Sequence, residues 1–303
     1  MLALGRLLRL SLAPSALADV AAGLVFANHG RWPAGPGPFC LMASSACVYH
    51  GAMALNDWHD REHDAGTRPD RPIPSGKVAA RTALALGVSL LVVGPLIALV
   101  HSPGAALWSM ALGLVALSYD LGGRGAWLGP LLLALCRAGN LGLGLFFASG
   151  VFGATIPFQQ ALVAMVLYGV FVLRVSQLGR MEDGEDADLA GPKPKALVLS
   201  AALMLLFVPF LPPFGRVGGI LVASAIAWPA AFSLVRLARL RADWTRADVE
   251  RAMGLCLRRF LIFSAALAAR AWNPPAFDAL IVAALILSGY LISARLRRVF
   301  PPS

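Results

Sequence analysis

The sequence predicts an all-α integral membrane protein, and three observations lead to this fold class. Apolar residues make up 58% and charged residues 14% of the 303 residues, which is more apolar and less charged than a soluble domain. Apolar runs of about 17–25 residues, the length of a helix that crosses a bilayer, recur along the whole chain. Basic residues gather in the connections between these runs. The net charge of +10 therefore indicates membrane topology and no nucleic-acid partner.

Taken in order, ten apolar runs are expected to form membrane helices. These runs are 10–28, 37–57, 82–100, 104–119, 127–149, 157–178, 196–212, 216–236, 254–271 and 277–294. The first run is long enough to span and is not followed by a cleavage site and a polar domain, so we interpret it as a membrane helix and not as a signal peptide. The four cysteines have no paired spacing and are expected to be small core residues.

The distribution of lysine and arginine orients the predicted helices. With the N-terminus inside, 21 of the 26 basic residues lie on one side, and only Arg31, Arg216 and Arg270 lie on the other. The positive-inside rule then places the loops at 61–81 and 180–195 in the cytoplasm. We expect a multi-pass protein of a bacterial inner (plasma) membrane, with its active site on the cytoplasmic side.

The segment at the end of the second run carries acidic residues at helical spacing. If one helix continues through residue 64, Asn56, Asp57, Asp60 and Asp64 fall within a sector of about 100°. Like charges at this spacing repel each other, so the arrangement favours bound cations. Ligands that are all oxygen favour Mg²⁺, which substrate phosphates usually complete. His59 and His63 could instead mark a zinc pair, but no third soft ligand is near in sequence.

A second acidic cluster makes the two halves of the chain a weak repeat. Ten of the 16 acidic residues lie at 57–70 or 182–188. In the second cluster, Glu182 and Asp183 both stand at helical spacing from Asp186, and a basic loop of proline and glycine comes after them. We expect a single domain, 1–303, in which the acidic motifs at 56–64 and 182–186 form one site.

These motifs resemble those of a known family. Asn56, Asp60 and Asp64 match the NxxxDxxxD motif of the UbiA family of intramembrane prenyltransferases, and the RPDRPIPSG stretch from Arg68 to Gly76 resembles the segment on the C-terminal side of that motif in the family. The second cluster stands where the family carries a DxxxD motif. The resemblance covers nearly the whole chain and implies a bundle of nine transmembrane helices open sideways to lipid. The run at 277–294 would add a tenth, C-terminal helix.

The resemblance implies a role for each motif residue. Mg²⁺ ions would be held by Asn56, Asp60, Asp64, Glu182, Asp183 and Asp186, although the register of the second motif stays open between Glu182 and Asp183. The isoprenoid diphosphate would be bound by Arg68, Arg71, Arg124 and Lys195. Tyr119 and Arg124 resemble the family's Tyr-x-x-x-Lys, one residue longer. Catalysis would depend on Asp60, Asp64, Asp186 and Arg68.

The expected function is Mg²⁺-dependent transfer of a prenyl group from an isoprenoid diphosphate to a lipophilic acceptor within the lipid bilayer. One alternative is a UbiA-like intramembrane terpene cyclase, whose product would contain only the isoprenoid skeleton. Another is a cation-coupled transporter, which should place its key charges near the middle of the membrane. The acceptor's class stays open among aromatic acids, quinone precursors, tetrapyrroles, sugars and lipid phosphates.

Several polar residues inside the predicted spans should face the interior of the bundle, because a charge in lipid costs about 2.5 kcal/mol or more. Asp19 is expected to pair with an arginine. The alternative is that some of these side chains orient the polar head of the acceptor. The candidates for the acceptor cavity are Asp19, Tyr119, Arg137 and Asn140.

The charge bias makes a testable prediction about topology. In a variant without native cysteines, a single cysteine placed at an exposed position in 57–81 or 180–195 should resist an impermeant thiol reagent in intact cells. The same cysteine should react after lysis. Rapid labelling from outside the cell would invert the predicted orientation.

Overall fold

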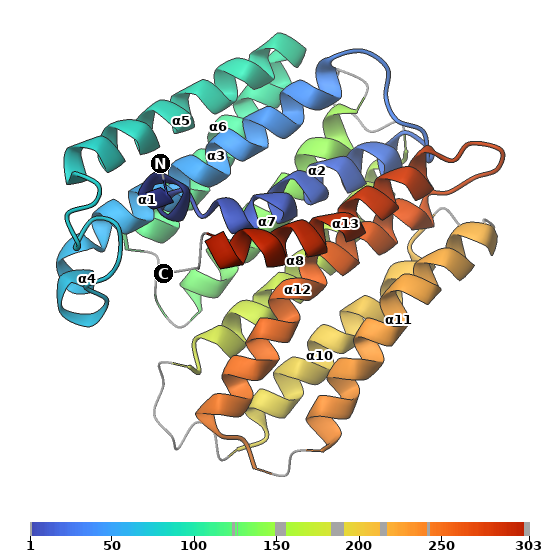
Figure 1. Cartoon of the computed structure of the whole chain (residues 1–303). Helices are drawn as coiled ribbons and strands as arrows, with labels where there is room; N and C mark the ends of the chain where they lie inside the picture. The colour runs from blue at the N-terminus through green and yellow to red at the C-terminus, as the bar shows by residue number, and fades with distance from the viewer. Residues whose placement is uncertain are drawn as a thin grey trace.

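The computed structural model describes residues 2–122, 125, 127–148, 156–182, 191–212, 217–240 and 243–299. Helices joined by short connections make up this part of the chain (Figure 1). The helices are α1 (Leu2–Leu7), η1 (Leu10–Leu12), α2 (Ala13–Ala27), α3 (Gly37–His59), α4 (Arg61–Thr67), α5 (Ala80–His101), α6 (Pro103–Asp120), α7 (Leu128–Phe147), α8 (Phe158–Gly179), α10 (Lys193–Phe207), η2 (Val208–Phe210), α11 (Val217–Arg239), α12 (Arg246–Arg270) and α13 (Asp278–Val299).

Each of the ten predicted runs forms a long helix. Within the described residues, nine helical segments are long and apolar enough to cross a membrane, and α13 is the last of them. The run at 104–119 forms α6, which is not among the nine, because the polar residues Ser118, Tyr119 and Asp120 lower the hydropathy of this 18-residue helix. It packs between α5 and α7 and also contacts α3. The predicted all-α membrane fold, including its C-terminal helix, is confirmed.

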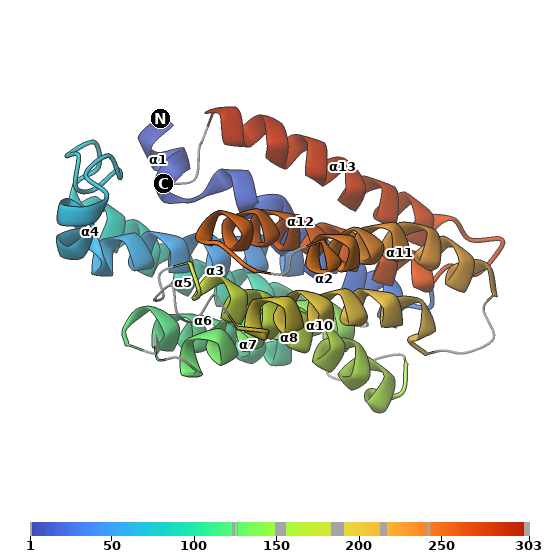
Figure 2. The same ribbon diagram turned by 90° about the horizontal axis from the view of Figure 1, so that it is seen from below.

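The helix α2 lies at the centre of the bundle and is buried along most of its length. It packs against α3, α7, α12 and α13. Figure 2 shows α13 on one face of the bundle, outside α2 and α12. At the crossing of α2 and α7, a Cβ added to Gly144 would lie 2.2 Å from the Val20 carbonyl oxygen, and one added to Gly23 would lie 2.6 Å from the Leu141 carbonyl oxygen. Glycine at both positions lets the two backbones approach each other.

The N-terminal segment lies at the same end of the bundle as the end of α3 and the end of α13. Leu7 packs in a small cluster with Ala54 of α3, with Ile73 and Val78 of the loop after α4, and with the start of α5. The hydroxyl of Ser293 in α13 donates to the Ser11 carbonyl oxygen at 2.6 Å. The chain therefore brings both terminal segments to the end that carries the first acidic motif, as the predicted topology requires.

One helix begins well before its apolar run. The predicted start of 254 becomes Arg246 in α12, because Thr245 and Asp248 form a capping box in which each side chain accepts a hydrogen bond from the other residue's backbone N–H. This cap stabilises a helical start in a polar sequence. Hydropathy alone misses such a start.

The close crossing of α2 and α7 predicts that Gly144→Ala destabilises the protein, because the new methyl group has no room against the Val20 carbonyl. Overpacking of this kind costs about 1–3 kcal/mol. Gly254→Ala in α12 is the matched control, since a Cβ there meets no atom within 4 Å. Thermal denaturation in detergent should show a lower Tm for the first variant only. Equal Tm values would mean that the crossing is not tightly packed.

Candidate functional site

The first acidic motif lies at a break between two helices. The helix α3 ends at His59, Asp60 is its C-cap, and α4 begins at Arg61. The expectation of one helix through residue 64 is therefore wrong. Backbone hydrogen bonds from Asp60 N to Asn56 O (3.0 Å) and from Asp64 N to Asp60 O (2.9 Å) nevertheless carry the chain across the break. The motif residues stay close together, but Asp64 belongs to a separate short helix.

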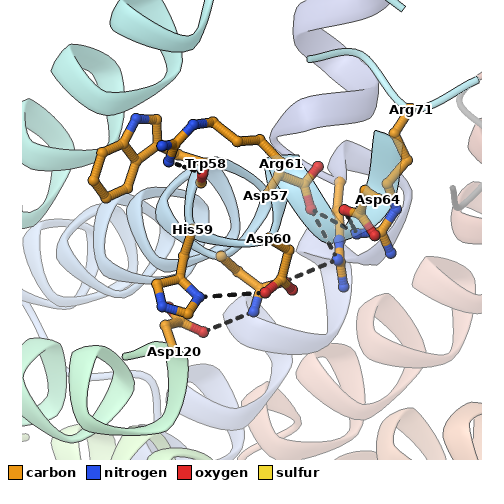
Figure 3. Close-up of polar contacts among 10 residues, drawn as sticks. Asp57, Trp58, His59, Asp60, Arg61, Asp64, Arg71 and Asp120 are labelled. Carbon is orange, nitrogen blue, oxygen red and sulfur yellow. Dashed lines mark hydrogen bonds and ion pairs between the residues drawn. The ribbon is translucent and has the colours of Figure 1, made fainter. Parts of the chain in front are cut away.

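Two buried carboxylates and two arginines form the centre of this site (Figure 3). The side chains of Asp57 and Asp64 are each 2% exposed. Asp57 Oδ1 lies 3.2 Å from Arg9 Nη2 and 3.6 Å from Arg71 Nη1. Arg71 also donates a short hydrogen bond to Asp64. Arg71 thus bridges carboxylates from α3 and α4, and the four charges cancel.

The side chain of Asn56 joins this network to α6. Its Nδ2 donates to Asp120 Oδ1 at 2.9 Å, and its Oδ1 accepts from Arg9 Nη2 at 3.4 Å. Asp120, at the end of α6, is fully buried. The bond to Asp120 orients the amide so that its oxygen accepts from Arg9, the same guanidinium that contacts Asp57.

The other motif residues are more exposed. The side chain of Asp60 is 16% exposed and lies 3.3 Å from His59 Nδ1. Arg68 is exposed at the start of the loop after α4, whereas Arg71 is buried. Backbone hydrogen bonds order this loop, including Ser75 N to Arg71 O at 3.0 Å. The loop therefore holds Arg71 in place and leaves Arg68 accessible to a ligand.

The structure tests the second half of the predicted site only at its edges. Asp183, Asp186 and Arg124 lie outside the described residues. Glu182 comes after α8 and is half-buried, and Lys195 is half-buried in the first turn of α10. Tyr119 is half-buried beside Asp120. The meeting of the two acidic clusters stays a prediction.

The described oxygen donors suit a divalent cation that binds together with a phosphate ligand. Within the described ranges, no three His, Cys, Asp or Glu side chains converge as a ready metal site, and this includes the histidines considered for zinc. The Arg9 and Arg71 guanidiniums occupy the space between the carboxylates. Asp57 Oδ2, however, is buried and accepts no hydrogen bond from a described group. Mg²⁺ needs only one or two protein carboxylates, with water and phosphate as its other ligands, so the donor set fits it.

A second polar network lies inside the bundle, around Asp19 of α2. Asp19 Oδ2 accepts from Arg137 Nη1 at 3.1 Å and from Asn140 Nδ2 at 3.4 Å. Asp19 Oδ1 accepts from Tyr168 at 2.7 Å and from Ser264 at 2.9 Å. The predicted pair of Asp19 with an arginine is thus present, and four donors from α7, α8 and α12 satisfy a fully buried carboxylate.

Sequence reasoning missed three members of the site. Asp120 stands next to Tyr119, at the end of an apolar run on the predicted cytoplasmic side, and this placement is a signal that could have identified it. Arg9 gave no such signal, because its contact with Asp57 depends on a left-handed backbone conformation with φ 49° between α1 and η1. Asp57 was placed on the acidic face but was not selected as a ligand.

The model of the UbiA prenyltransferase family matches residues 16–262. The chain belongs to this family. The match runs from α2 into α12, contains the α3–α4 motif, and ends before α13. The resemblance inferred from the motifs is confirmed.

Two curated relatives with local sequence similarity to this chain are named as synthases. The digeranylgeranylglyceryl phosphate synthase of Methanothrix thermoacetophila is 46% identical over 61 residues, which cover 20% of this chain and 23% of the relative. The bacteriochlorophyll synthase 33 kDa chain of Cereibacter sphaeroides is 31% identical over 151 residues, which cover 46% of this chain and 47% of the relative. The chain thus aligns with less than half of either relative's length.

A solved UbiA structure shares the fold over most of this chain. The UbiA homolog from Archaeoglobus fulgidus bound to DMAPP and Mg²⁺ has a TM-score of 0.62 and 16% sequence identity, and the alignment covers 96% of this chain and 99% of that chain. At this identity the likeness shows the fold. The predicted UbiA-type architecture is therefore confirmed.

The Asp19 network predicts strong coupling between Asp19 and Arg137. Removing one partner of a buried pair costs about 3–5 kcal/mol, because the other charge is left uncompensated. Asp19→Asn and Arg137→Gln should each lower the Tm in detergent, and the double variant should lose less than the sum of the two. Arg295→Gln, at an exposed position of α13, is the control. Losses that simply add would show that the pair is not coupled.

Proposed function

We propose that this protein transfers a prenyl group from an isoprenoid diphosphate to a lipophilic acceptor within the lipid bilayer, in a Mg²⁺-dependent reaction of a single domain, 1–303. The observation that carries this proposal is the set of oxygen donors at the end of α3, including the unpartnered Asp57 Oδ2, in a chain of the UbiA family. A homolog of the same fold is described as bound to DMAPP and Mg²⁺. Relatives are named digeranylgeranylglyceryl phosphate synthase and bacteriochlorophyll synthase, and the first name contains prenyl (geranylgeranyl) groups.

The proposed metal ligands come from both acidic clusters. The sequence predicts Asn56, Asp60, Asp64, Glu182, Asp183 and Asp186, and the buried Asp57 Oδ2 is a further candidate. The cation they hold would stabilise the negative charge of the diphosphate. The proposed phosphate donors are Arg68, Arg71, Arg124 and Lys195, which can make charge-assisted hydrogen bonds to its oxygens. Because Arg71 already contacts Asp57 and Asp64, it lies where a diphosphate next to these carboxylates would be within its reach.

The chemistry proposed for this site is substitution at the prenyl carbon. The bond between this carbon and the diphosphate oxygen breaks, and its electron pair leaves with the diphosphate. A nucleophilic atom of the acceptor forms the new bond to the carbon and releases its proton. The arginines stabilise the departing charge, and the apolar interior around Phe146 and Phe171, both buried, keeps water from the carbon.

We place the reaction at the cytoplasmic face of a plasma membrane. The support is the concentration of basic residues on one side of the predicted topology. Arg9, the end of α3 and the end of α13 lie together at one end of the bundle. Isoprenoid diphosphates are charged and water-soluble at one end, so a site at this end can take them from the cytosol. The acceptor and the prenyl tail can then stay in the lipid phase.

The two alternatives have less support. A cation-coupled transporter needs a carboxylate that is available in the interior, but Asp19 is saturated by four donors. A terpene cyclase would use the same diphosphate site. Mass spectrometry of products formed from a series of isoprenoid diphosphates and a membrane lipid extract separates the two enzymes, because only transfer gives a product that contains a second skeleton.

The proposal predicts that Asp60→Asn and Asp64→Asn each reduce prenyl transfer by about 100-fold or more, since both remove charge that the cation needs. Excess chelator should have the same effect. Glu62→Gln is the matched control between them, because the side chain of Glu62 is 84% exposed. The assay is product formation per folded protein, because Asp64→Asn also removes one partner of the buried pair with Arg71 and is expected to lower the Tm. Near-normal turnover of either variant would remove the metal role.

A further inference from the structure

A charged cavity lies outside the acidic motif, and none of the motif residues lines it. It has a volume of about 260 Å³ and lies between the start of α2 and the helices α7, α12 and α13. Its polar lining consists of Ser15, Arg137, Arg258, Tyr290 and Ser293, and the rest is apolar. Tyr290 and Ser293 come from α13, which lies beyond the stretch matched by the family model. The cavity therefore combines the family bundle with the C-terminal helix of this chain.

The charge of the lining is positive. Two guanidiniums line the cavity, and no described carboxylate does. Asp19 neutralises the charge of Arg137, whose side chain is 14% exposed. Arg258 is exposed and donates to the Tyr290 hydroxyl at 3.4 Å. Since none of the described ion pairs involves Arg258, one positive charge in the lining is left to attract an anion.

The lining also has the donors that an oxyanion needs. The guanidinium of Arg258 and the hydroxyl of Tyr290 can donate to it, whereas the Ser293 hydroxyl already donates to the Ser11 carbonyl oxygen. Arg137 adds a second guanidinium, whose Nη2 lies 2.8 Å from Ser15 Oγ. The volume is slightly below the range of about 300–1,000 Å³ typical of sites for whole drug-sized ligands. The cavity thus suits one head group, while leucines 12, 257 and 261 provide an apolar path for the attached body.

Arg137 lies both in the cavity lining and next to α3, the helix that carries the acidic motif at its end. Its guanidinium carbon lies 5.8 Å from the ring centroid of Tyr49 in α3 and 5.2 Å from that of Phe260 in α12. Tyr49 precedes Asn56 by seven residues, which places the two on one face of α3 about 10 Å apart along the helix. A molecule anchored at Arg137 can therefore extend toward a prenyl group whose diphosphate lies at Asn56.

We propose that this cavity binds the acceptor by an anionic head group, a carboxylate or a phosphate on an apolar body, with Arg258, Tyr290 and Arg137 as its donors. This inference rests on the proposed prenyl transfer and names the class of its acceptor. The same chemistry belongs to anionic phospholipids of the bilayer. The two kinds of site differ in competition. An acceptor site must still bind and release the acceptor when the membrane contains anionic phospholipids, whereas a lipid site would be filled by those phospholipids.

The test uses the purified full chain in nanodiscs of zwitterionic phosphatidylcholine, with decyl phosphate as the anionic probe and 1-decanol as its neutral counterpart. Decyl phosphate should raise the Tm saturably and decanol should not. Arg258→Gln and Tyr290→Phe should each weaken the apparent affinity, the first by about tenfold, as expected for the loss of one charge-assisted hydrogen bond. Arg258→Lys should keep part of the affinity. Arg251→Gln, exposed on α12 outside the cavity, should keep all of it.

Each other outcome overturns the inference. Equal shifts with decanol, or full affinity in Arg258→Gln, would show that the cavity does not recognise an anion. Loss of decyl phosphate binding when the nanodiscs contain phosphatidylglycerol would assign the cavity to a bilayer lipid. Binding of geranyl diphosphate with Mg²⁺ is measured on the same samples. If geranyl diphosphate binds but decyl phosphate does not, only the acceptor cavity is refuted. If geranyl diphosphate does not bind, the proposed function itself is refuted.

Discussion

Neutralisation of charge inside an apolar bundle is the constraint on which the rest of this structure depends. Asp19 lies in the central helix α2, where an uncompensated carboxylate would cost several kcal/mol. Its four hydrogen-bond donors come from α7, α8 and α12. Satisfying this one charge therefore fixes the positions of three helices around α2. The glycine crossing of α2 and α7 adds close packing at the same contact.

The same constraint has a different solution at the end of α3. There the carboxylates of Asp57 and Asp64 are balanced by Arg9 and Arg71, which come from the N-terminal segment and from a loop. These are the protein's own cations, and they lie on segments that are not part of long helices. In the proposed reaction, the negative diphosphate and its cation add charges that also cancel. The site can thus keep its electrostatic balance with and without substrate, while its carboxylates stay buried.

Much of this architecture could be predicted from the sequence, because hydropathy and helical spacing are local properties. The ten apolar runs became ten long helices, and the motif with Asn56, Asp60 and Asp64 identified the family. The break at Asp60 was missed, since a helical face does not reveal where a helix stops. The contacts of Arg9 and Asp120 with the motif were missed because tertiary packing joins residues 47 and 64 positions away from Asn56. The pairing of Asp19 was expected, but only the fold could select Arg137 and add Tyr168 and Ser264.

The central claim is that the two acidic clusters form one diphosphate site, although about 120 residues separate them in sequence. The most direct measurement is the turnover of Asp60→Ala, Asp186→Ala and their double variant, on protein with unchanged Tm. Residues that act as one unit are strongly non-additive. The account predicts a large loss in each single variant and a double variant barely worse than the poorer single one. Losses that multiply cleanly would contradict a shared site, and so would near-normal turnover in all three of Glu182→Ala, Asp183→Ala and Asp186→Ala.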